Sequence, residues 1–519
     1  MGVHLGVCRF GGNMLLTLSD LKLKPSQSEK TLLSICEKKL RAPCRYFKIL
    51  KKSLDARDKK EIHWVYTVEC SDKPFTPPPR VFEKIKKPMP RVYVVGAGPC
   101  GLFAALRLLD HGIKPILIER GKPVEERMKD VETFRTTGKL NVESNVQFGE
   151  GGAGTFSDGK LFTQTKSSLN REVLDTFVRF GAPEEVGYLG KPHIGSDNLT
   201  KVVRNIRNYI LSEGGEVRFS SLFTGAQFKD GKLVSVEING VREDADELVL
   251  AIGHSARDTF EALYNGGFLL EQKEFAAGVR IEHLQSKISK AQYGAGYSAL
   301  PAADYKLVSH AGERAAFTFC MCPGGEVIPS ASEEGGVVTN GMSYFARDGR
   351  NANSALVVQV RKEDFGSEHP LAGVAFQRKI ERAAYESAGK NYKAPVQLVG
   401  DFLADKESYY FGEVKPTYSV GTQFVPMRAI LPKVITETLR AALVDMNYRL
   451  SGFAAFDAVL TGVETRTSSP VRILRGENFE AAERHGVYPC GEGAGYAGGI
   501  TSSAADGLRA AEALSKKYF

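Results

Sequence analysis

The chain has 519 residues, of which 42% are hydrophobic and 25% charged, and its formal net charge is +8. These values are typical of an ordinary soluble globular protein with two or three domains. No uncharged apolar run approaches the ~20 residues that a membrane-spanning helix needs, so we expect no membrane association.

Residues 1–13 lack the basic start of a signal peptide, and two glycines interrupt their apolar run. Met1 and Met14 are both candidate starts of translation, and in the second case residues 1–13 form an unstructured extension. The cysteine spacing fits neither a zinc site nor a disulfide framework, which predicts a reducing, cytoplasmic location. The eight cysteines are Cys8, Cys36, Cys44, Cys70, Cys100, Cys320, Cys322 and Cys490.

Residues 14–73 predict a small α+β module, in the order strand, helix, strand, strand. Six prolines then lie between residues 74 and 90. Proline cannot pair within a central strand, so this segment is predicted to be a stiff linker between domains.

From Arg91 the pattern changes to strand, turn, helix and second strand. Gly96, Gly98 and Gly101 form G-x-G-x-x-G at the turn, which allows a tight turn, a close pyrophosphate and close helix–strand packing. Glu119 ends the second strand, where its carboxylate can accept hydrogen bonds from both hydroxyls of a ribose. The same carboxylate disfavours a 2′-phosphate, and therefore NADP, in this site.

Two further glycine-rich loops indicate FAD and not a nicotinamide dinucleotide. "QFGEGGAGTFSDGKL" at 147–161 and "CGEGAGYAGGITSSAADG" from Cys490 flank a predicted β-meander at 222–252. Glu492 can bond the ribityl or phosphate region, and the helix that follows Gly498, Gly499 and Ile500 can direct its amides at the flavin ring.

The chain resembles a family labelled FAD-dependent (NAD(P)/FAD-dependent) dehydrogenases, of the glutathione-reductase-type FAD fold. The phrases that carry the resemblance include "FGEGGAGTFSDGKL", "KPHIGSDNL", "FCMCPGGEVI" and "TGVETRTSSPVRI". It implies a Rossmann-like α/β FAD-binding domain at 91–274 and 457–519. An α+β substrate domain is inserted at 275–456.

The resemblance also implies the residues that contact a non-covalent FAD. Cys100 stands where alanine is common, and Glu492 stands where aspartate is more usual. The implied contacts are Gly96, Gly98, Pro99, Gly101, Glu119, Arg120, Gly149, Gly151, Gly152, Ala153, Gly154, Thr155, Lys160, Leu161, Val217, Ala251, Gly253, Gly491, Glu492, Gly499 and Ile500.

Glu464 and Arg466 are the candidate catalytic residues. Two apart on a strand, they share a face, and they lie just before the chain returns to the FAD domain. They can bind a substrate carboxylate or move a proton near the flavin; the alternative is a structural ion pair at the domain junction.

Other candidates have structural interpretations that we favour. Cys320 and Cys322 are expected on a buried strand, because a disulfide across one residue is strained. His254 is a candidate near the flavin but is expected to be a capping or core histidine. Arg280, His283 and Arg347 are candidate anion-binding groups, again with a structural alternative.

The resulting hypothesis is an FAD-dependent oxidoreductase that transfers hydride between flavin N5 and an unidentified small molecule. No second nucleotide-binding signature lies between Phe275 and Phe456, so NAD(P)H, if it is the donor, docks transiently. One alternative is a flavin-dependent tRNA-modifying enzyme, with Lys51, Lys52, Lys59, Lys60, Tyr46 and Trp64 at the RNA. A solvated strand face is the simpler interpretation of these residues, so nucleic acid is not expected as a partner. The other alternative is a non-catalytic FAD-binding protein.

Overall fold

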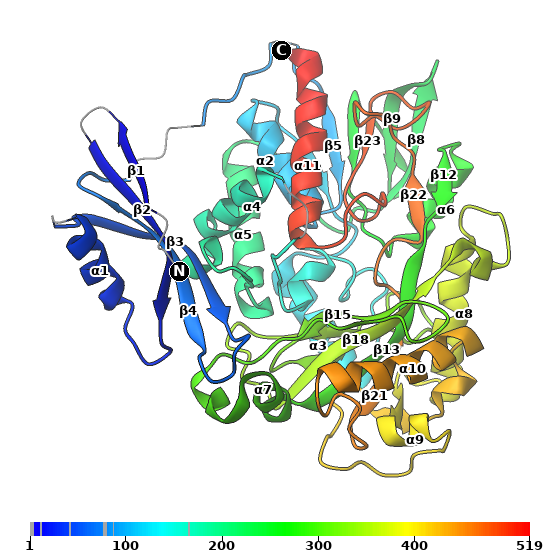
Figure 1. Cartoon of the computed structure of the whole chain (residues 1–519). Helices are drawn as coiled ribbons and strands as arrows, with labels where there is room; N and C mark the ends of the chain where they lie inside the picture. The colour runs from blue at the N-terminus through cyan, green and yellow to red at the C-terminus, as the bar shows by residue number, and fades with distance from the viewer. Residues whose placement is uncertain (1–4, 11–12, 41–42, 76–79, 87, 164–166) are drawn as a thin grey trace.

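The computed structural model describes the whole chain except residues 1–4, 11–12, 41–42, 76–79, 87 and 164–166. It contains an N-terminal module, a domain built on a parallel sheet, and an inserted domain with a mostly antiparallel sheet (Figure 1). Among the described residues, no helix combines the length and the apolar character needed to cross a membrane.

The N-terminal module is a four-stranded antiparallel sheet with one helix packed on it. The strand order is β1-β2-β4-β3. Leu18 and Val68 from the sheet and Leu32 from the helix are fully buried between the two layers. The elements are β1 (Leu5–Phe10), β2 (Asn13–Leu23), α1 (Lys30–Leu40), β3 (Tyr46–Asp55) and β4 (His63–Ser71).

The structure differs from the expected unstructured extension at residues 1–13. Residues 5–10 form β1, which pairs antiparallel with β2 in a register that sets Leu5 opposite Leu18. Met14 therefore lies inside the β1–β2 hairpin and not at its beginning. Residues 1–4 and 11–12 lie outside the described residues.

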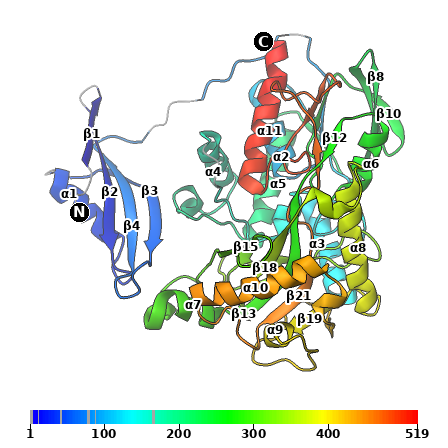
Figure 2. The same cartoon turned by 45° about the vertical axis from the view of Figure 1, so that its right-hand side comes forward.

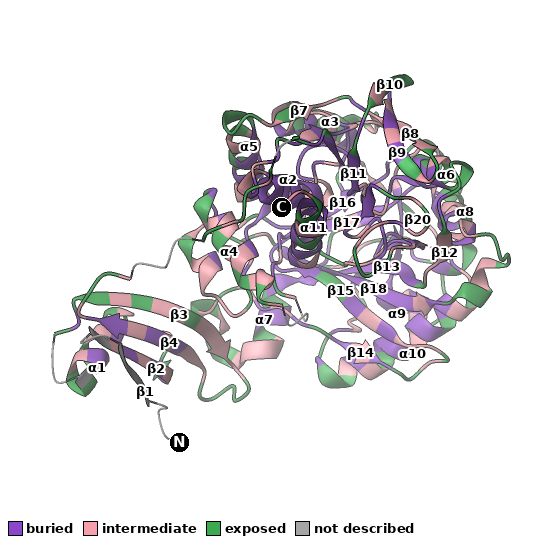
Figure 3. Ribbon diagram, turned by 90° about the horizontal axis from the view of Figure 1, so that it is seen from above, coloured by how far each residue is buried: buried purple, intermediate pink, exposed green. Residues whose placement is uncertain are grey.

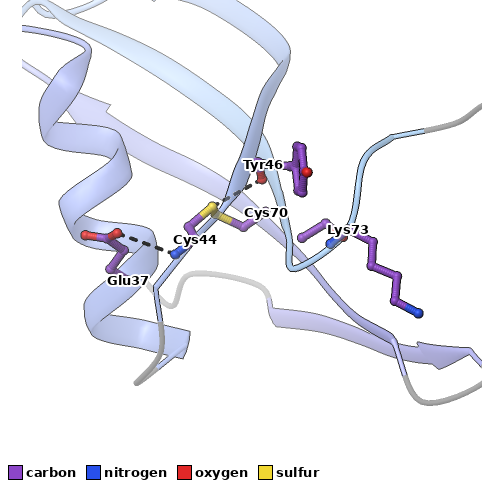
Figure 4. The surroundings of a disulfide bond; sticks show 6 residues. Glu37, Cys44, Tyr46, Cys70 and Lys73 are labelled. Atoms are coloured by element: carbon purple, nitrogen blue, oxygen red, sulfur yellow. Dashed lines mark hydrogen bonds between the residues drawn. A yellow bond between two sulfur atoms is a disulfide. The ribbon is translucent and has the colours of Figure 1, made fainter.

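A disulfide joins Cys44 to Cys70, which corrects the prediction that the cysteines form no disulfide (Figure 4). Cys70 pairs with Phe47 in the β3–β4 ladder, which brings the segment before β3 beside the end of β4. The prediction of a cytoplasmic location relied on the absence of disulfides, so it stays a prediction without that support.

The central domain has a five-stranded parallel sheet in the order β23-β11-β5-β6-β7. β5 is a short run of apolar residues because both of its faces are buried. Val92 and Val94 face the helices, whereas Tyr93 and Val95 face the meander β8–β10. The strands of the sheet and meander are β5 (Val92–Val95), β6 (Ile116–Ile118), β7 (Glu216–Arg218), β8 (Phe223–Lys229), β9 (Lys232–Ile238), β10 (Val241–Asp244), β11 (Glu247–Leu250) and β23 (Val487–Pro489).

Helices α2 and α11 form the buried layer on the other face, at the centre of the view in Figure 3. Gly507 of α11 allows this close packing, because a Cβ there would lie 2.1 Å from the carbonyl oxygen of Cys100 on α2. The helices of this domain are α2 (Pro99–Asp110), α3 (Val124–Thr137), α4 (Leu169–Arg179), α5 (Ser196–Ser212), α6 (Arg257–Asn265) and α11 (Ile500–Ser515).

The inserted domain is a seven-stranded sheet in the order β14-β15-β18-β13-β21-β19-β20. Helices α7, α9 and α10 lie on the side of this sheet away from the parallel sheet (Figures 1 and 2). The elements are β13 (Phe275–Leu284), α7 (Gln285–Tyr293), β14 (Val308–Ser309), β15 (Ala316–Cys322), β16 (Glu326–Pro329), β17 (Thr339–Met342), β18 (Asn351–Val360), α8 (Ala372–Ser387), β19 (Ala394–Leu398), α9 (Val399–Leu403), β20 (Thr422–Phe424), α10 (Lys433–Arg449) and β21 (Val459–Glu464).

The chain returns from the inserted domain later than the expected boundary at residue 457. β21 pairs with β13 and β19 and is therefore a strand of the inserted sheet. After Glu464 the chain leaves that sheet, and β22 (Val471–Ile473) pairs with β12 (Leu270–Gln272) beside the central domain. Residues 457–464 thus belong to the inserted domain.

Candidate functional site

A cavity lies between the parallel sheet and the inserted domain, at the carboxyl ends of β5 and β11. The strand order reverses between these two strands, because the chain runs from β5 to β6 and β7 on one side and returns to β11 on the other. Ligands of open α/β sheets bind at such a point. The expected cofactor contacts that line the cavity are Gly96, Gly98, Pro99, Glu119, Arg120, Gly152, Ala153, Gly154, Lys160, Ala251, Gly253, Glu492, Gly499 and Ile500.

The three glycines of the first turn have two different roles. A Cβ at Gly96 would lie 2.4 Å from the Ala251 carbonyl oxygen, and one at Gly101 would lie 1.8 Å from the Gly96 carbonyl oxygen. These two glycines therefore serve packing. Gly98 lines the cavity and is the N-cap of α2. No side chain of the described residues caps this end of the helix. The first amides of α2 are thus open to an anion.

The Glu119 carboxylate accepts more hydrogen bonds from the protein backbone than the sequence predicted. One carboxylate oxygen accepts the amide of Ala97 at 2.9 Å, and the other accepts the amides of Gly121 and Gly149, also at 2.9 Å. A carboxylate has about four acceptor positions, so three amides leave about one. Glu119 can therefore receive one ribose hydroxyl, where both were expected.

Arg127 on α3 organises the second glycine-rich loop, and sequence reasoning did not identify it. Its guanidinium is fully buried, and among the described residues it donates to backbone carbonyls of that loop and of the two residues before it. Burial lowers its pKa to about 10, so it remains a cation at neutral pH. The acceptors are the carbonyl oxygens of Asn145, Val146, Gly149, Glu150 and Gly152.

The remaining expected contacts do not line the cavity but support its walls. The Thr155 hydroxyl donates to the Glu150 carbonyl, and the Gly491 amide donates at 2.8 Å to Asp506 on α11. The expected contacts absent from the lining are Gly101, Gly149, Gly151, Thr155, Leu161, Val217 and Gly491.

The third glycine-rich loop leaves free space at the start of α11. A Cβ at Gly498 or Gly499 would meet nothing within 4 Å, and no side chain caps the helix. Glu492 lines the cavity beside this helix end, and its carboxylate accepts no hydrogen bond from the described residues. Burial raises the pKa of Glu492 to about 7, against a smaller opposing effect of Lys273.

The end of β15 forms the roof of the cavity. Cys322 lies buried on this strand as expected, whereas Cys320 is exposed, which corrects the prediction for that residue. A β-bulge follows Phe319, and Cys320 adopts a left-handed backbone conformation with φ +43°. Phe319 and Cys320 are exposed toward the cavity, whereas Met321 and Cys322 are buried. We call residues 319–321 the roof segment.

Glu464 and Arg466 both line the cavity, but they do not pair with each other. Glu464 pairs with Arg280, and Arg466 pairs with Glu381. Both Glu464 oxygens accept from Arg280 Nη1, at 3.0 and 3.1 Å. Arg466 donates to Glu381 from Nε at 3.2 Å and from Nη2 at 3.0 Å. Burial raises the pKa of Glu464 against the opposing effect of Arg280.

Glu381 on α8 connects three parts of the chain. Besides Arg466, its carboxylate accepts from Arg257 on α6, at 2.7 and 2.9 Å, and from the Thr465 hydroxyl at 2.6 Å. Glu381 is only 2% exposed. The two arginines keep its pKa well below the usual range despite burial. Glu381 therefore joins the central domain, the inserted domain and the returning chain.

The other candidate groups are largely committed within the protein. His254 lines the cavity with Nδ1 3.0 Å from the Ser255 hydroxyl. Burial and the nearby Arg466 and Arg257 lower its pKa to about 3, so it is neutral at pH 7. The groups proposed for anion binding bond elsewhere: Arg280 to Glu464, Asn353 and the Cys320 carbonyl, His283 to the Phe453 carbonyl, and Arg347 to Asp158.

The raised pKa of Glu492 predicts a pH dependence of stability in the FAD-free protein. The Glu492 carboxyl is harder to ionise in the folded protein than in the unfolded one. Its contribution to the free energy of unfolding is therefore fully present below about pH 4.5 and is lost as the pH rises through about 7. The melting temperature of Glu492→Gln should therefore rise relative to wild type between pH 5 and 8. Calorimetry measures this, with the exposed Glu477→Gln as control. A difference that is constant with pH would contradict the prediction.

Three segments of the chain match known families. Residues 89–133 match an FAD binding domain, and residues 274–467 match a family described as FAD-dependent protein, C-terminal domain-like. Residues 16–71 match a domain of unknown function (DUF8436).

Two solved structures have a distant similarity. A geranylgeranyl bacteriochlorophyll reductase-like protein from Thermoplasma acidophilum has 12% identity and a TM-score of 0.37, covering 82% of this chain and 78% of its own. Glycine oxidase from Geobacillus kaustophilus has 10% identity and a TM-score of 0.36, covering 83% of this chain and 96% of its own. Similarity at this level says nothing about the reaction of this chain.

The full-length relative is much closer. An uncharacterized protein of Clostridium beijerinckii is 48% identical over 491 residues, which cover 91% of this chain and 92% of that protein. Together with the FAD-related matches over residues 89–133 and 274–467, this relationship shows that the chain belongs to a family of FAD-dependent proteins.

Proposed function

We propose that the chain is an FAD-dependent oxidoreductase of the glutathione-reductase-type fold, in which the cavity holds an extended FAD and the inserted domain covers its ring. The observation that carries this proposal is the convergence of three glycine-rich loops on one cavity at the reversal of the strand order. A small-molecule substrate would lie between the ring and the roof segment.

The residues present fit FAD along the length of the cavity. Uncapped amides at the start of α2 suit the pyrophosphate, and the remaining acceptor position of Glu119 suits the adenosine ribose. The start of α11 behind Gly499 suits the electron-rich pyrimidine end of the ring. Ser221, Leu222 and Phe223 also line the cavity, and they would supply the adenine contacts in place of Val217, which does not line it.

When bound, FAD supplies hydride exchange at N5. The chain supplies the enclosure and the polar groups around it. The roof segment excludes water from the space above the ring. Arg466 uses three of its five N–H donors on Glu381 and Ser332, so two remain for a substrate. Glu464 pairs with Arg280, which in turn donates to the Cys320 carbonyl oxygen and so fixes the roof segment.

The cavity also bears on how a nicotinamide donor would bind. The later G-x-G-x-x-G runs, at 149–154 and 493–498, lie in the second and third glycine-rich loops of this same cavity, and residues 275–456 contain none. NAD(P)H as a donor would therefore dock transiently against the flavin. Glu119 disfavours NADP in the dinucleotide site itself, because its carboxylate would repel a 2′-phosphate.

A nucleic-acid substrate is less well supported than a small molecule. Lys52 pairs with Glu29 at 2.7 Å and lies 4.7 Å from the ring centroid of Trp64, and Lys59 donates to the Ala291 carbonyl. These residues hold the N-terminal module together or attach it to the inserted domain. Lys52 is half-buried, whereas Lys51, Lys59 and Lys60 are exposed.

The test of this function is the visible spectrum of the purified protein under anaerobic conditions. We expect a flavin spectrum that bleaches on addition of NADH, or that resists NADH and bleaches with an oxidisable substrate. A protein without flavin that also fails to bind added FAD would contradict the proposal. A flavin that no donor reduces, although dithionite does, would favour the non-catalytic alternative.

Loss of the Arg127 cation should disrupt FAD binding. Arg127→Met keeps the aliphatic bulk but leaves buried loop carbonyls without donors, each at a cost of about 1–3 kcal/mol. We expect FAD affinity to fall roughly 10-fold or more, measured by flavin fluorescence. Arg204→Met removes a partly exposed arginine paired with Glu125 and serves as control. Equal FAD affinity in both variants would contradict the role of Arg127.

A further inference from the structure

The charged side chains that line the roof half of the cavity are nearly all paired. Arg466 pairs with Glu381, Glu464 with Arg280, and Asp158 with Arg347. His254 is neutral because its pKa is low. The three pairs each contain one positive and one negative group, and His254 is uncharged. None of these residues therefore gives this half of the cavity a net charge.

Lys160 is the exception. It lines the cavity and, among the described residues, forms no ion pair with a carboxylate. Its ammonium donates to the carbonyl oxygen of Met321 in the roof segment. An ammonium has three N–H donors, so two remain after this bond. The side chain thus extends from the glycine-rich loop to the roof and carries a positive charge that no carboxylate of the described residues approaches to ion-pair distance.

The roof residues beside Lys160 are apolar, whereas the carboxylate of Asp304 interacts with its charge from farther away and pairs with Lys191. Phe319 and Met321 belong to the roof segment, and Ile500 and Phe148 line the same cavity. An anion bound below the roof segment would have the Lys160 ammonium as its main hydrogen-bond donor. A charge-assisted hydrogen bond is also stronger in a water-poor cavity than in solvent.

We propose that Lys160 binds the carboxylate of a substrate whose apolar part packs between the roof segment and the flavin ring. This proposal rests on the proposed function, because the ring forms the floor of the space. It replaces the earlier expectation that Lys160 contacts FAD, since the ammonium bonds to the roof segment. Lys160 would then determine the preference for an anionic substrate.

The test uses the holoenzyme with benzoate as the probe and benzamide as its uncharged counterpart of similar size. Binding is followed by the change in the flavin absorption spectrum. We expect benzoate to perturb the wild-type spectrum and benzamide to do so far more weakly. In Lys160→Met the Kd for benzoate should rise roughly 10-fold or more, because a charge-assisted bond is lost.

The control variant is Lys201→Met, which removes the same charge from an exposed side chain on α5. It should bind benzoate like wild type. Equal benzoate affinity in Lys160→Met and wild type, or equal binding of benzamide and benzoate, would overturn the proposal. So would the absence of any benzoate effect on the wild-type spectrum.

The outcomes also separate this proposal from the proposed function. If the purified wild-type protein neither contains nor binds FAD, both fail. If FAD is bound and reducible but the benzoate result is negative, only the role of Lys160 fails. If Lys160→Met shifts the spectrum and reduction potential of the ligand-free flavin without changing benzoate affinity, Lys160 faces the flavin and the proposal is overturned.

Discussion

The site depends on the ion pairs that the buried Glu381 carboxylate forms with Arg257 and Arg466. The cavity lies between two different sheets, so its shape depends on contacts that fix the inserted sheet over the parallel one. Glu381 does this by binding Arg257 from the central domain and Arg466 from the returning chain. Burying these charges is costly, and a paired network of this kind contributes more to a defined arrangement than to net stability. We regard that as its role here.

Arg127 fixes the opposite wall in a similar way but without a carboxylate. Glycine-rich loops lack side chains with which to hold their own shape, so the loop at 145–152 takes its shape from carbonyls gathered around one cation. The amide of Gly149 then bonds to Glu119, which joins this loop to the first turn. The two loops that would enclose the pyrophosphate are therefore one connected structure.

Local patterns in the sequence predicted the parts of the fold that depend on neighbouring residues. The strand, turn and helix around Gly96 and Glu119 follow from such a pattern. The parts that depend on distant residues were missed: β21 joins a sheet begun almost two hundred residues earlier, and Cys44 meets Cys70 only through the β3–β4 ladder. The partners of Glu464 and Arg466, and the exposure of Cys320 at a bulge, carry no local signal either.

The central claim is that FAD lies extended in this cavity with its ring beneath the inserted domain. A crystal structure of the protein grown with FAD tests it most directly. We expect density for the adenosine beside Glu119 and Ser221, the pyrophosphate at the start of α2, and the ring between the start of α11 and the roof segment. FAD bound elsewhere, or a ring turned away from residues 319–321, would contradict the account.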